Sequence, residues 1–321
     1  YITPRRVGED GWELSIKALI DNADCSHKAR FTLIDADGNE KASTIADLRP
    51  IISAKLPVED PVLWNGRKNP YLYTVRCEIF DSTTQEVTDN IDIRTGLREY
   101  HIDSHKGFFL NGEHIKLQGV SRHQDRENMG NAITEKQHAE DIKIILDVGA
   151  NSVRLAHYQQ NSYFYDLCDE SGLLVWAEVP VISRFSPKRN ENAEQQLVEL
   201  IKQNYNHPSI FCWGIENEIT IAGSASKKLI TFLKHMHKVA RHLDPTRYTT
   251  CAQLTMCPVN SPLNHITDII GYNHYYGWYM GSCDEINNWL DEWHRENPEG
   301  KLCLSEYGAE GITKYHSDSP V

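Results

Sequence analysis

The stretch Ile210-Phe-Cys-Trp-Gly-Ile-Glu-Asn-Glu218 decides how the rest of the chain is interpreted. It is an apolar run that follows His207-Pro208 and ends on polar side chains. A run of this length with such flanks is typical of a buried parallel strand. Carboxylates are costly to bury without a compensating role, and a (β/α)8 barrel carries its chemistry at the carboxyl ends of its strands. The stretch therefore predicts a barrel strand that ends on a functional acid.

A second segment, Lys301-Leu-Cys-Leu-Ser-Glu306, has the same form, an apolar strand that ends on a carboxylate. Asn217 precedes Glu218, and Tyr-Gly-Ala follows Glu306. Two glutamates at the ends of different strands are the pair that glycoside hydrolysis needs, one as acid/base and one as nucleophile. The sequence therefore indicates a glycosidase.

Composition excludes several other classes of protein. The chain has 321 residues and a formal net charge of −12, which argues against nucleic acid and anionic membrane as partners. No apolar run is long enough to predict a transmembrane helix. The chain begins at Tyr1 without an initiator Met or a signal-peptide core. We therefore interpret it as a fragment or a processed form, and the compartment stays open between cytoplasm and periplasm.

Neither a metal nor a cofactor is expected. The 8 cysteines form no C-x-x-C pair and are interpreted as reduced, buried side chains. His235 and His237 are two residues apart on a predicted helix, so they do not share a face. Asp35-Ala-Asp-Gly-Asn-Glu40 resembles the start of an EF-hand, but its glycine stands at the fourth position instead of the sixth. We interpret that segment as a hairpin turn.

Residues 1–98 alternate apolar and polar side chains and predict an immunoglobulin-like β-sandwich. The alternation is clearest at Trp12, Leu14, Ile16, Ala18 and Ile20, and again at Tyr71, Tyr73, Val75, Cys77 and Ile79. Clusters of Asp, Asn and Gly separate the expected strands. No constellation of catalytic residues falls in this segment, so we predict a structural role for it.

Residues 99–321 change to strands that alternate with helices, after a hairpin at about 99–114 that we expect to cap the base of the barrel. The expected strands are 115–120, 150–156, 173–177, 210–218, 248–252, 269–275 and 302–305. Strand–helix alternation implies a parallel sheet, and seven such steps approach a TIM barrel. We predict a (β/α)8 TIM barrel truncated before its eighth strand, and we expect the natural protein to continue past Val321.

At this point the chain resembles glycoside hydrolase family 2, the β-galactosidase and β-glucuronidase group, over nearly its whole length. The motifs that carry the resemblance are Gly107-Phe-Phe-Leu-Asn-Gly112, Gly119-Val-Ser-Arg-His-Gln-Asp125, Val153-Arg-Leu-Ala-His-Tyr158, Trp176-Ala-Glu-Val-Pro180, Asn206-His-Pro-Ser209, Asn217-Glu218, Tyr275-Tyr-Gly-Trp-Tyr279 and Ser305-Glu-Tyr-Gly-Ala309. The Arg-His-Gln-Asp and His-Tyr-Gln forms look most like bacterial β-galactosidases. Family members also carry an N-terminal jelly-roll domain, which this sequence lacks.

The resemblance assigns roles residue by residue. Glu218 matches the general acid/base, Glu306 the nucleophile, and Asn217 the residue that binds the sugar 2-hydroxyl. Arg154 is placed to keep Glu306 ionised, and Tyr275 matches the tyrosine that donates to the nucleophile. His123 and His157 match histidines that contact sugar hydroxyls, although each could instead be a satisfied core histidine. A retaining mechanism then requires the two carboxyls to lie about 5–5.5 Å apart.

The sequence also departs from the family pattern. Glu216 stands where a small residue is usual, and we prefer Glu218 as the acid because Asn217 precedes it. Glu178 either orients the acid or pairs with a cation. Ile182 and Arg184 replace the Glu and His that bind magnesium in one branch of the family, so that metal site is not expected.

The favoured hypothesis is a retaining exo-glycosidase that hydrolyses terminal β-D-galactosides through a glycosyl-enzyme intermediate. A β-glucuronidase or another family 2 β-glycosidase is the alternative. A metal-dependent barrel hydrolase is disfavoured because no ligand cluster is evident. A non-catalytic carbohydrate-binding protein is disfavoured because a binder has no need of both Glu218 and Glu306. The expected partner is thus a β-galactoside, and a homo-oligomer remains open.

Overall fold

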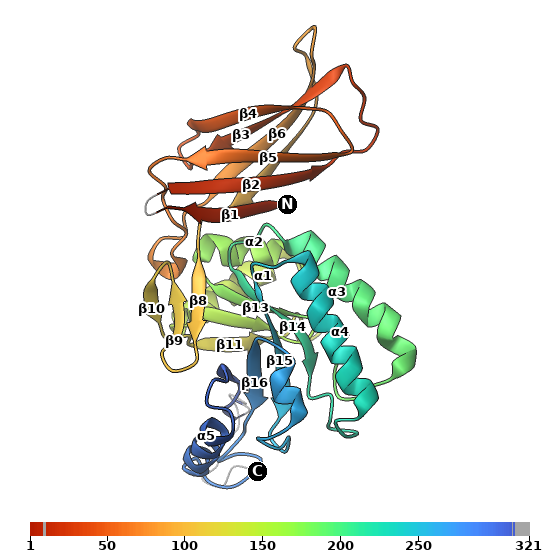
Figure 1. Ribbon diagram of the computed structural model, residues 1–321. Coiled ribbons are helices and arrows are strands. Elements are labelled where there is room, and N and C mark those ends of the chain that lie inside the picture. Colours follow the sequence, from red (N-terminus) through yellow and green to blue (C-terminus); the bar gives the residue numbers. More distant parts are fainter. Residues whose placement is uncertain (9–10, 310, 312–321) are drawn as a thin grey trace.

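The computed structural model describes residues 1–8, 11–309 and 311, and it shows a β-sandwich joined to a parallel barrel sheet (Figure 1). One antiparallel sheet of the sandwich has the order β1-β2-β5 and the other the order β4-β3-β6-β7. Their bounds are β1 Ile2–Val7, β2 Gly11–Leu19, β3 His27–Ile34, β4 Glu40–Asp47, β5 Ile51–Val58, β6 Tyr73–Asp81 and β7 Val87–Thr95. The sandwich fold predicted from the alternating pattern is confirmed.

The two sheets of the sandwich enclose one apolar core. Trp12, Leu14 and Ile16 are buried from β2, and Tyr73 and Val75 are buried from β6. Alternate residues of a strand point to opposite faces of its sheet. The alternation in the sequence therefore identified the inward faces of both strands.

The barrel sheet has seven parallel strands, each paired with the next strand along the chain, in the order β11 to β17. Their bounds are β11 Gly119–Arg122, β12 Ser152–Leu155, β13 Leu174–Glu178, β14 Ile210–Asn217, β15 Tyr248–Leu254, β16 Ile269–Asn273 and β17 Leu302–Glu306. Every residue of β14 is buried. Because all strands run in the same direction, their carboxyl ends meet at one end of the sheet.

The α-helices lie on the outside of this sheet, and Figure 1 shows α3 and α4 side by side along it. Their bounds are α1 Glu135–Asp147, α2 Ser162–Ser171, α3 Asn190–Asn204, α4 Lys227–Leu243 and α5 Glu285–Glu296, with short 3-10 helices η1 Gly66–Lys68, η2 Pro187–Arg189 and η3 Pro262–His265. The predicted capping box at Thr134 and Gln137 is present at the start of α1. None of the described helices is both long and apolar enough to cross a membrane.

One expectation about the barrel needs correction, and one connection differs from the general alternation of strands and helices. The strand expected at 115–120 begins only at Gly119, because Ile115 belongs to β10 (Glu113–Ile115), which pairs with β9 (Gly107–Leu110). The connection between β15 and β16 contains the 3-10 helix η3 in place of an α-helix. Both differences arise from tertiary pairing and packing, which a local apolar pattern does not specify.

The hairpin expected at the base of the barrel is a three-stranded sheet of β8 (Tyr100–Asp103), β9 and β10. Phe108 and Leu110 of this sheet are buried in one cluster with Trp176 and Phe211 of the barrel strands. The sheet therefore closes the lower part of the barrel interior with apolar side chains. The polar side chains of the barrel strands lie at the opposite end, where the strands have their carboxyl ends.

Candidate active site

Five barrel strands deliver polar side chains to the carboxyl end of the sheet. These side chains are Arg154 at the end of β12, Glu178 at the end of β13, Asn217 at the end of β14, Asn273 at the end of β16 and Glu306 at the end of β17. All except Glu306 are buried, and 15% of the Glu306 side chain is exposed. They form one connected network of hydrogen bonds.

Arg154 is the centre of that network. Its Nε donates to Glu178, its Nη1 donates to Glu306, and its Nη2 donates to Asn217 Oδ1 at 2.8 Å. Its guanidinium carbon also lies 5.0 Å from the ring centroid of Trp176 in the barrel interior. Burial alone would lower the pKa of Arg154, but the charges of Glu178 and Glu306 outweigh it and raise that pKa. The guanidinium thus stays charged between two carboxylates.

Glu306 has a second donor besides Arg154. The hydroxyl of Tyr275 donates to Glu306 Oε2. Burial raises the pKa of Tyr275, and the hydrogen bond and the charge of Glu306 raise it further. The phenol therefore keeps its proton and acts only as a donor to this carboxylate.

Glu178 pairs with the guanidinium of Arg154, which is one of the two roles that the sequence left open. Its Oε2 lies 2.9 Å from His157 Nδ1, and its Oε1 accepts from Arg154. The other nitrogen of His157, Nε2, lies 3.7 Å from Glu306 Oε1. The histidine ring is therefore held between two carboxylates at the edge of the site.

His123 lies farther out than His157. Its ring meets the His157 ring edge to face, with centroids 5.3 Å apart, and it is exposed. Its neighbour Arg122 is directed elsewhere, to Asp141 and Gln160. Among the residues that the structure describes, His123 forms no ion pair, and its Nδ1 lies 3.5 Å from the hydroxyl of Tyr158.

Glu218 stands apart from the cations. Asn273 Nδ2 donates to Glu218 Oε1 at 3.0 Å and to Asn217 Oδ1 at 3.1 Å. No ion pair formed by the described residues involves Glu218, whereas Glu306 pairs with Arg154. The two glutamates therefore occupy different electrostatic surroundings.

Asn273 was not identified from the sequence. Ser305 Oγ donates to its Oδ1 at 2.7 Å, and its side chain is fully buried. The only local signal is a polar residue at the end of an apolar strand, two positions before Tyr275. Its place between Asn217 and Glu218 depends on the neighbouring strands, so the sequence alone did not reveal it.

Glu216 is buried but is not part of the network around Arg154. The backbone N–H of Ile219 donates to its Oε2 at 3.1 Å, and Gln253 Nε2 donates to its Oε1 at 3.3 Å. None of its hydrogen bonds reaches Arg154, Tyr275 or Glu306. Its carboxyl is committed to the backbone and to β15.

A pocket of about 570 Å³ opens at these residues, along β11, β12 and β17. Among the residues predicted from the sequence, His123, Arg154, His157, Tyr275 and Glu306 line it. A larger cavity of about 820 Å³ lies between the sandwich and the ends of α3 and α4, and its lining contains none of the predicted site residues. Asn217 and Glu218 are not among the residues that line the smaller pocket, and they are joined to it through Arg154 and Asn273.

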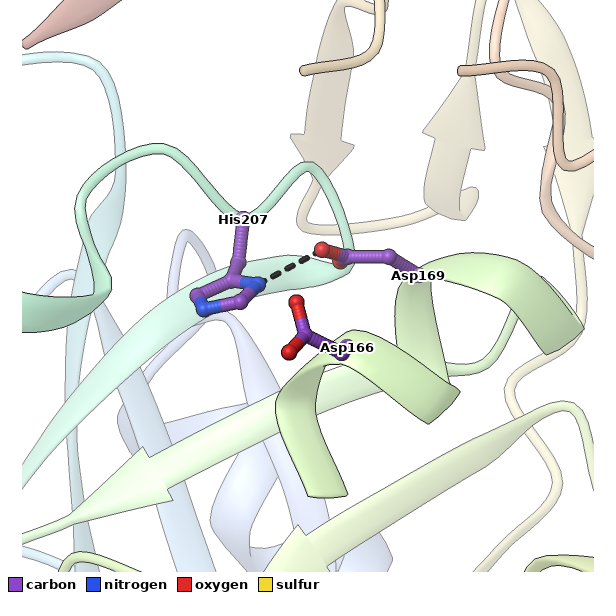
Figure 2. A group of neighbouring side chains, drawn as sticks. All are labelled: Asp166, Asp169 and His207. Atoms are coloured by element: carbon purple, nitrogen blue, oxygen red, sulfur yellow. Dashed lines mark hydrogen bonds and ion pairs between the residues drawn. The ribbon is translucent and has the colours of Figure 1, made fainter. Parts of the chain in front are cut away.

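One other group of acidic and histidine side chains lies elsewhere, at the joint between the sandwich and the barrel. Figure 2 shows Asp166 and Asp169 of α2 beside His207, with ligand atoms within 4.8 Å of one another. Each already has protein partners. His207 Nδ1 lies 2.6 Å from Asp169, and Arg94 of β7 pairs with Asp166 at 2.9 Å. We interpret the group as a structural ion-pair network that joins the two parts of the chain.

Comparison with known proteins identifies the family. Residues 1–98 match the model of "Glycosyl hydrolases family 2", and residues 102–318 match that of "Glycosyl hydrolases family 2, TIM barrel domain". A β-glucuronidase of Bacteroides fragilis is 37% identical over 100% of this chain and 47% of its own length. The chain thus spans about half the length of that curated relative.

Solved structures agree with the family models. The structure of an FMN-binding β-glucuronidase from Facaelibacterium prausnitzii L2-6 superposes with a TM-score of 0.94 at 42% identity, over 99% of this chain and 49% of that one. A putative β-galactosidase from Bacteroides fragilis superposes with a TM-score of 0.92 at 36% identity, over 99% of this chain and 48% of that one. The names of these relatives support the alternative hypothesis, a β-glucuronidase, better than the favoured hypothesis of a β-galactosidase. The chain belongs to glycoside hydrolase family 2.

Proposed function

We propose that the protein formed by this chain is a retaining β-glycosidase that acts on β-D-glucuronides, with Glu306 as nucleophile and Glu218 as general acid/base. The observation that carries the proposal is the unequal environment of the two glutamates. Arg154 and Tyr275 both donate to Glu306, while the side chain of Glu218 accepts, among the described residues, from the neutral amide of Asn273 alone. A nucleophile must be ionised, and an acid must hold a proton at neutral pH.

The first half of the reaction follows from this arrangement. A Glu306 oxygen forms a bond to the anomeric carbon, and the bond from that carbon to the leaving oxygen breaks. Glu218 gives its proton to the leaving oxygen. Positive charge develops on the sugar ring in the transition state, beside the carboxylate of Glu306.

The second half reverses these roles. Glu218, now ionised, removes a proton from water as the water oxygen bonds to the anomeric carbon, and Glu306 departs as a carboxylate. Two displacements on the same carbon retain its configuration. We propose that Asn217 binds the sugar 2-hydroxyl, since Arg154 and Asn273 fix its side-chain oxygen and no described residue accepts from its amide nitrogen. His123 and His157, which line the pocket, would contact other hydroxyls.

The choice of glucuronide over galactoside rests on relatives that carry the name β-glucuronidase at 37% and 42% identity. The test is the initial rate of hydrolysis of a p-nitrophenyl β-D-glucuronide against the matching β-D-galactoside, with the complete protein. We expect faster glucuronide cleavage that is abolished in Glu306→Gln. Faster galactoside cleavage would overturn the substrate and keep the mechanism.

The roles of the two glutamates need a separate experiment. A 2-deoxy-2-fluoro-glucuronyl fluoride should become attached to Glu306, as located by mass spectrometry of peptides. Azide should restore the turnover of Glu218→Ala on an activated aryl glucuronide and yield a β-glycosyl azide. Labelling of a different carboxylate would overturn the assignment of the nucleophile.

A further inference from the structure

Glu216 is a buried carboxyl for which the proposed reaction has no use. Its side chain is 1% exposed, it lies two residues before Glu218, and no ion pair of the described residues involves it. A carboxyl in such a place costs free energy of folding. Its retention calls for a compensating role in the local structure.

The residue beside it, Glu218, has an unusual backbone. Its φ of +48° lies in the left-handed region, which is strained for a residue other than glycine and persists only where the surroundings hold it. Both peptide groups that flank its Cα are anchored. Its own N–H donates to Ala252 O at 2.8 Å, and the N–H of the next residue, Ile219, donates to Glu216 Oε2 at 3.1 Å.

We propose that Glu216 is a positioning residue for the general acid/base, because its carboxyl fixes the peptide that follows Glu218 and so sets the direction of the Glu218 side chain. This inference rests on the role proposed for Glu218. The direction of the Cα–Cβ bond follows from the two flanking peptide planes. Without the Glu216 carboxyl, the peptide plane that follows Glu218 keeps, among the described residues, only the hydrogen bond from Ile221 N–H to Glu218 O at 2.9 Å. The plane can then turn, and the acid can swing away from the leaving oxygen.

The neighbours of Glu216 indicate which protonation state of its carboxyl holds the peptide that follows Glu218. Burial raises the pKa of Glu216 to about 8, and the hydrogen bond from Ile219 lowers it only in part. A neutral carboxyl has one oxygen that accepts and one O–H that donates. Ile219 N–H supplies the donor. Gln253 Oε1 has no hydrogen-bond partner among the described residues, and it accepts from the protonated carboxyl once the Gln253 amide is rotated by 180°.

This pairing gives the buried carboxyl at position 216 a compensating role. A protonated carboxyl meets both the N–H of Ile219 and the amide oxygen of Gln253 without adding charge beside Glu218. A glutamine at position 216 would do the same, since its oxygen accepts and its amide donates. A methionine would fill similar space and offer neither.

The test compares Glu216→Met, Glu216→Gln and the wild type of the complete protein on aryl β-D-glucuronides that differ in leaving group. Assistance by a general acid matters most when the leaving oxygen is a poor leaving group. We expect Glu216→Met to lose at least tenfold in kcat/KM with the phenyl glucuronide and less than threefold with the 2,4-dinitrophenyl glucuronide. Glu216→Gln should stay within threefold of wild type on both.

Leu200→Ala, a cavity change in the core beside α3, is the matched control for a loss of stability. It should lower both rates by the same factor, if at all. If Glu216→Met loses the same factor in kcat/KM on both substrates, Glu216 has only a structural role and the inference is overturned. Glu218→Ala separates this outcome from failure of the proposed function. If it cleaves the phenyl glucuronide at the wild-type rate, Glu218 is not the acid and the proposed function itself fails.

Discussion

Glu216→Gln should stabilise the protein by an amount that grows with pH. The carboxyl is buried, and its pKa is raised by that burial from an ordinary value of 4.5 to about 8. Between these two values the folded state holds a proton that the unfolded chain has released. Stability is therefore lost as pH rises from 4.5 towards 8, since the unfolded state binds fewer protons than the native state. A glutamine side chain does not titrate in this range, so the variant loses no stability from this position as the pH rises.

The size of the effect follows from the same values. Each unit of pH inside this window costs the wild type about 1.4 kcal/mol. Raising the pH from 5 to 7 should therefore widen the advantage of Glu216→Gln by about 3 kcal/mol. At pH 4 the proton is bound in both states and the pH-dependent advantage disappears.

Urea unfolding followed by tryptophan fluorescence at pH 4, 5, 6 and 7 measures the free energy of unfolding of both proteins. Glu199→Gln, the same change at an exposed position of α3, is the matched control. A difference between wild type and Glu216→Gln that stays constant over this range would refute the reasoning. It would mean that the pKa of Glu216 is the same in the folded and unfolded states.

Three further outcomes are expected in the complete protein. Arg154→Lys keeps a charge but loses the fork that serves Glu178, Asn217 and Glu306, so kcat/KM for an aryl glucuronide should fall at least a hundredfold by steady-state kinetics, and a loss below tenfold would contradict the central role of the guanidinium. Tyr275→Phe removes one donor to a charged group, worth about 1.5–3 kcal/mol, so the same assay should show a loss of about ten- to a hundredfold, and an unchanged rate would exclude the hydrogen bond from the reaction. In His207→Asn the melting temperature should fall most below pH 6.5. Burial lowers the pKa of His207, but the charge of Asp169 outweighs it and raises that pKa, so the stabilisation is present in acid and is lost as pH rises through the raised value; an equal deficit at pH 5.5 and pH 9 would count against the charged pair.

The sequence by itself determined the architecture and the ends of the key strands. The alternation at Trp12, Leu14 and Ile16 predicted the inward face of β2, and all three are buried. The apolar run before Glu218 predicted β14, which is buried throughout. These features are local, because a strand of the sandwich buries one face, and an inner strand of a barrel buries both.

The motifs also carried residues that the fold brings together. Arg154 and Tyr275 were expected beside Glu306 from the resemblance, and both donate to it. Each stands at or just after the end of a strand, so a parallel sheet places them at one end whatever the details of packing. Their catalytic roles stay proposals that the experiments above test.

Only the tertiary structure decided which of these side chains meet. It paired Glu178 with Arg154, and it placed Asn273 between Asn217 and Glu218. Both results depend on side chains from different strands, tens of residues apart in the chain, that meet only when the strands align. Local periodicity records which face of a strand is buried, whereas the partner across a network is fixed by register and by packing between strands.

The same reason explains Glu216. Its sequence position marked it as an unusual carboxyl, and nothing in the sequence showed that Ile219 N–H and Gln253 would engage it. The left-handed backbone of Glu218 turns the chain back so that a carboxyl two residues earlier reaches the next peptide. A turn of this kind is set by the strands on either side of it, and so it belongs to the folded molecule.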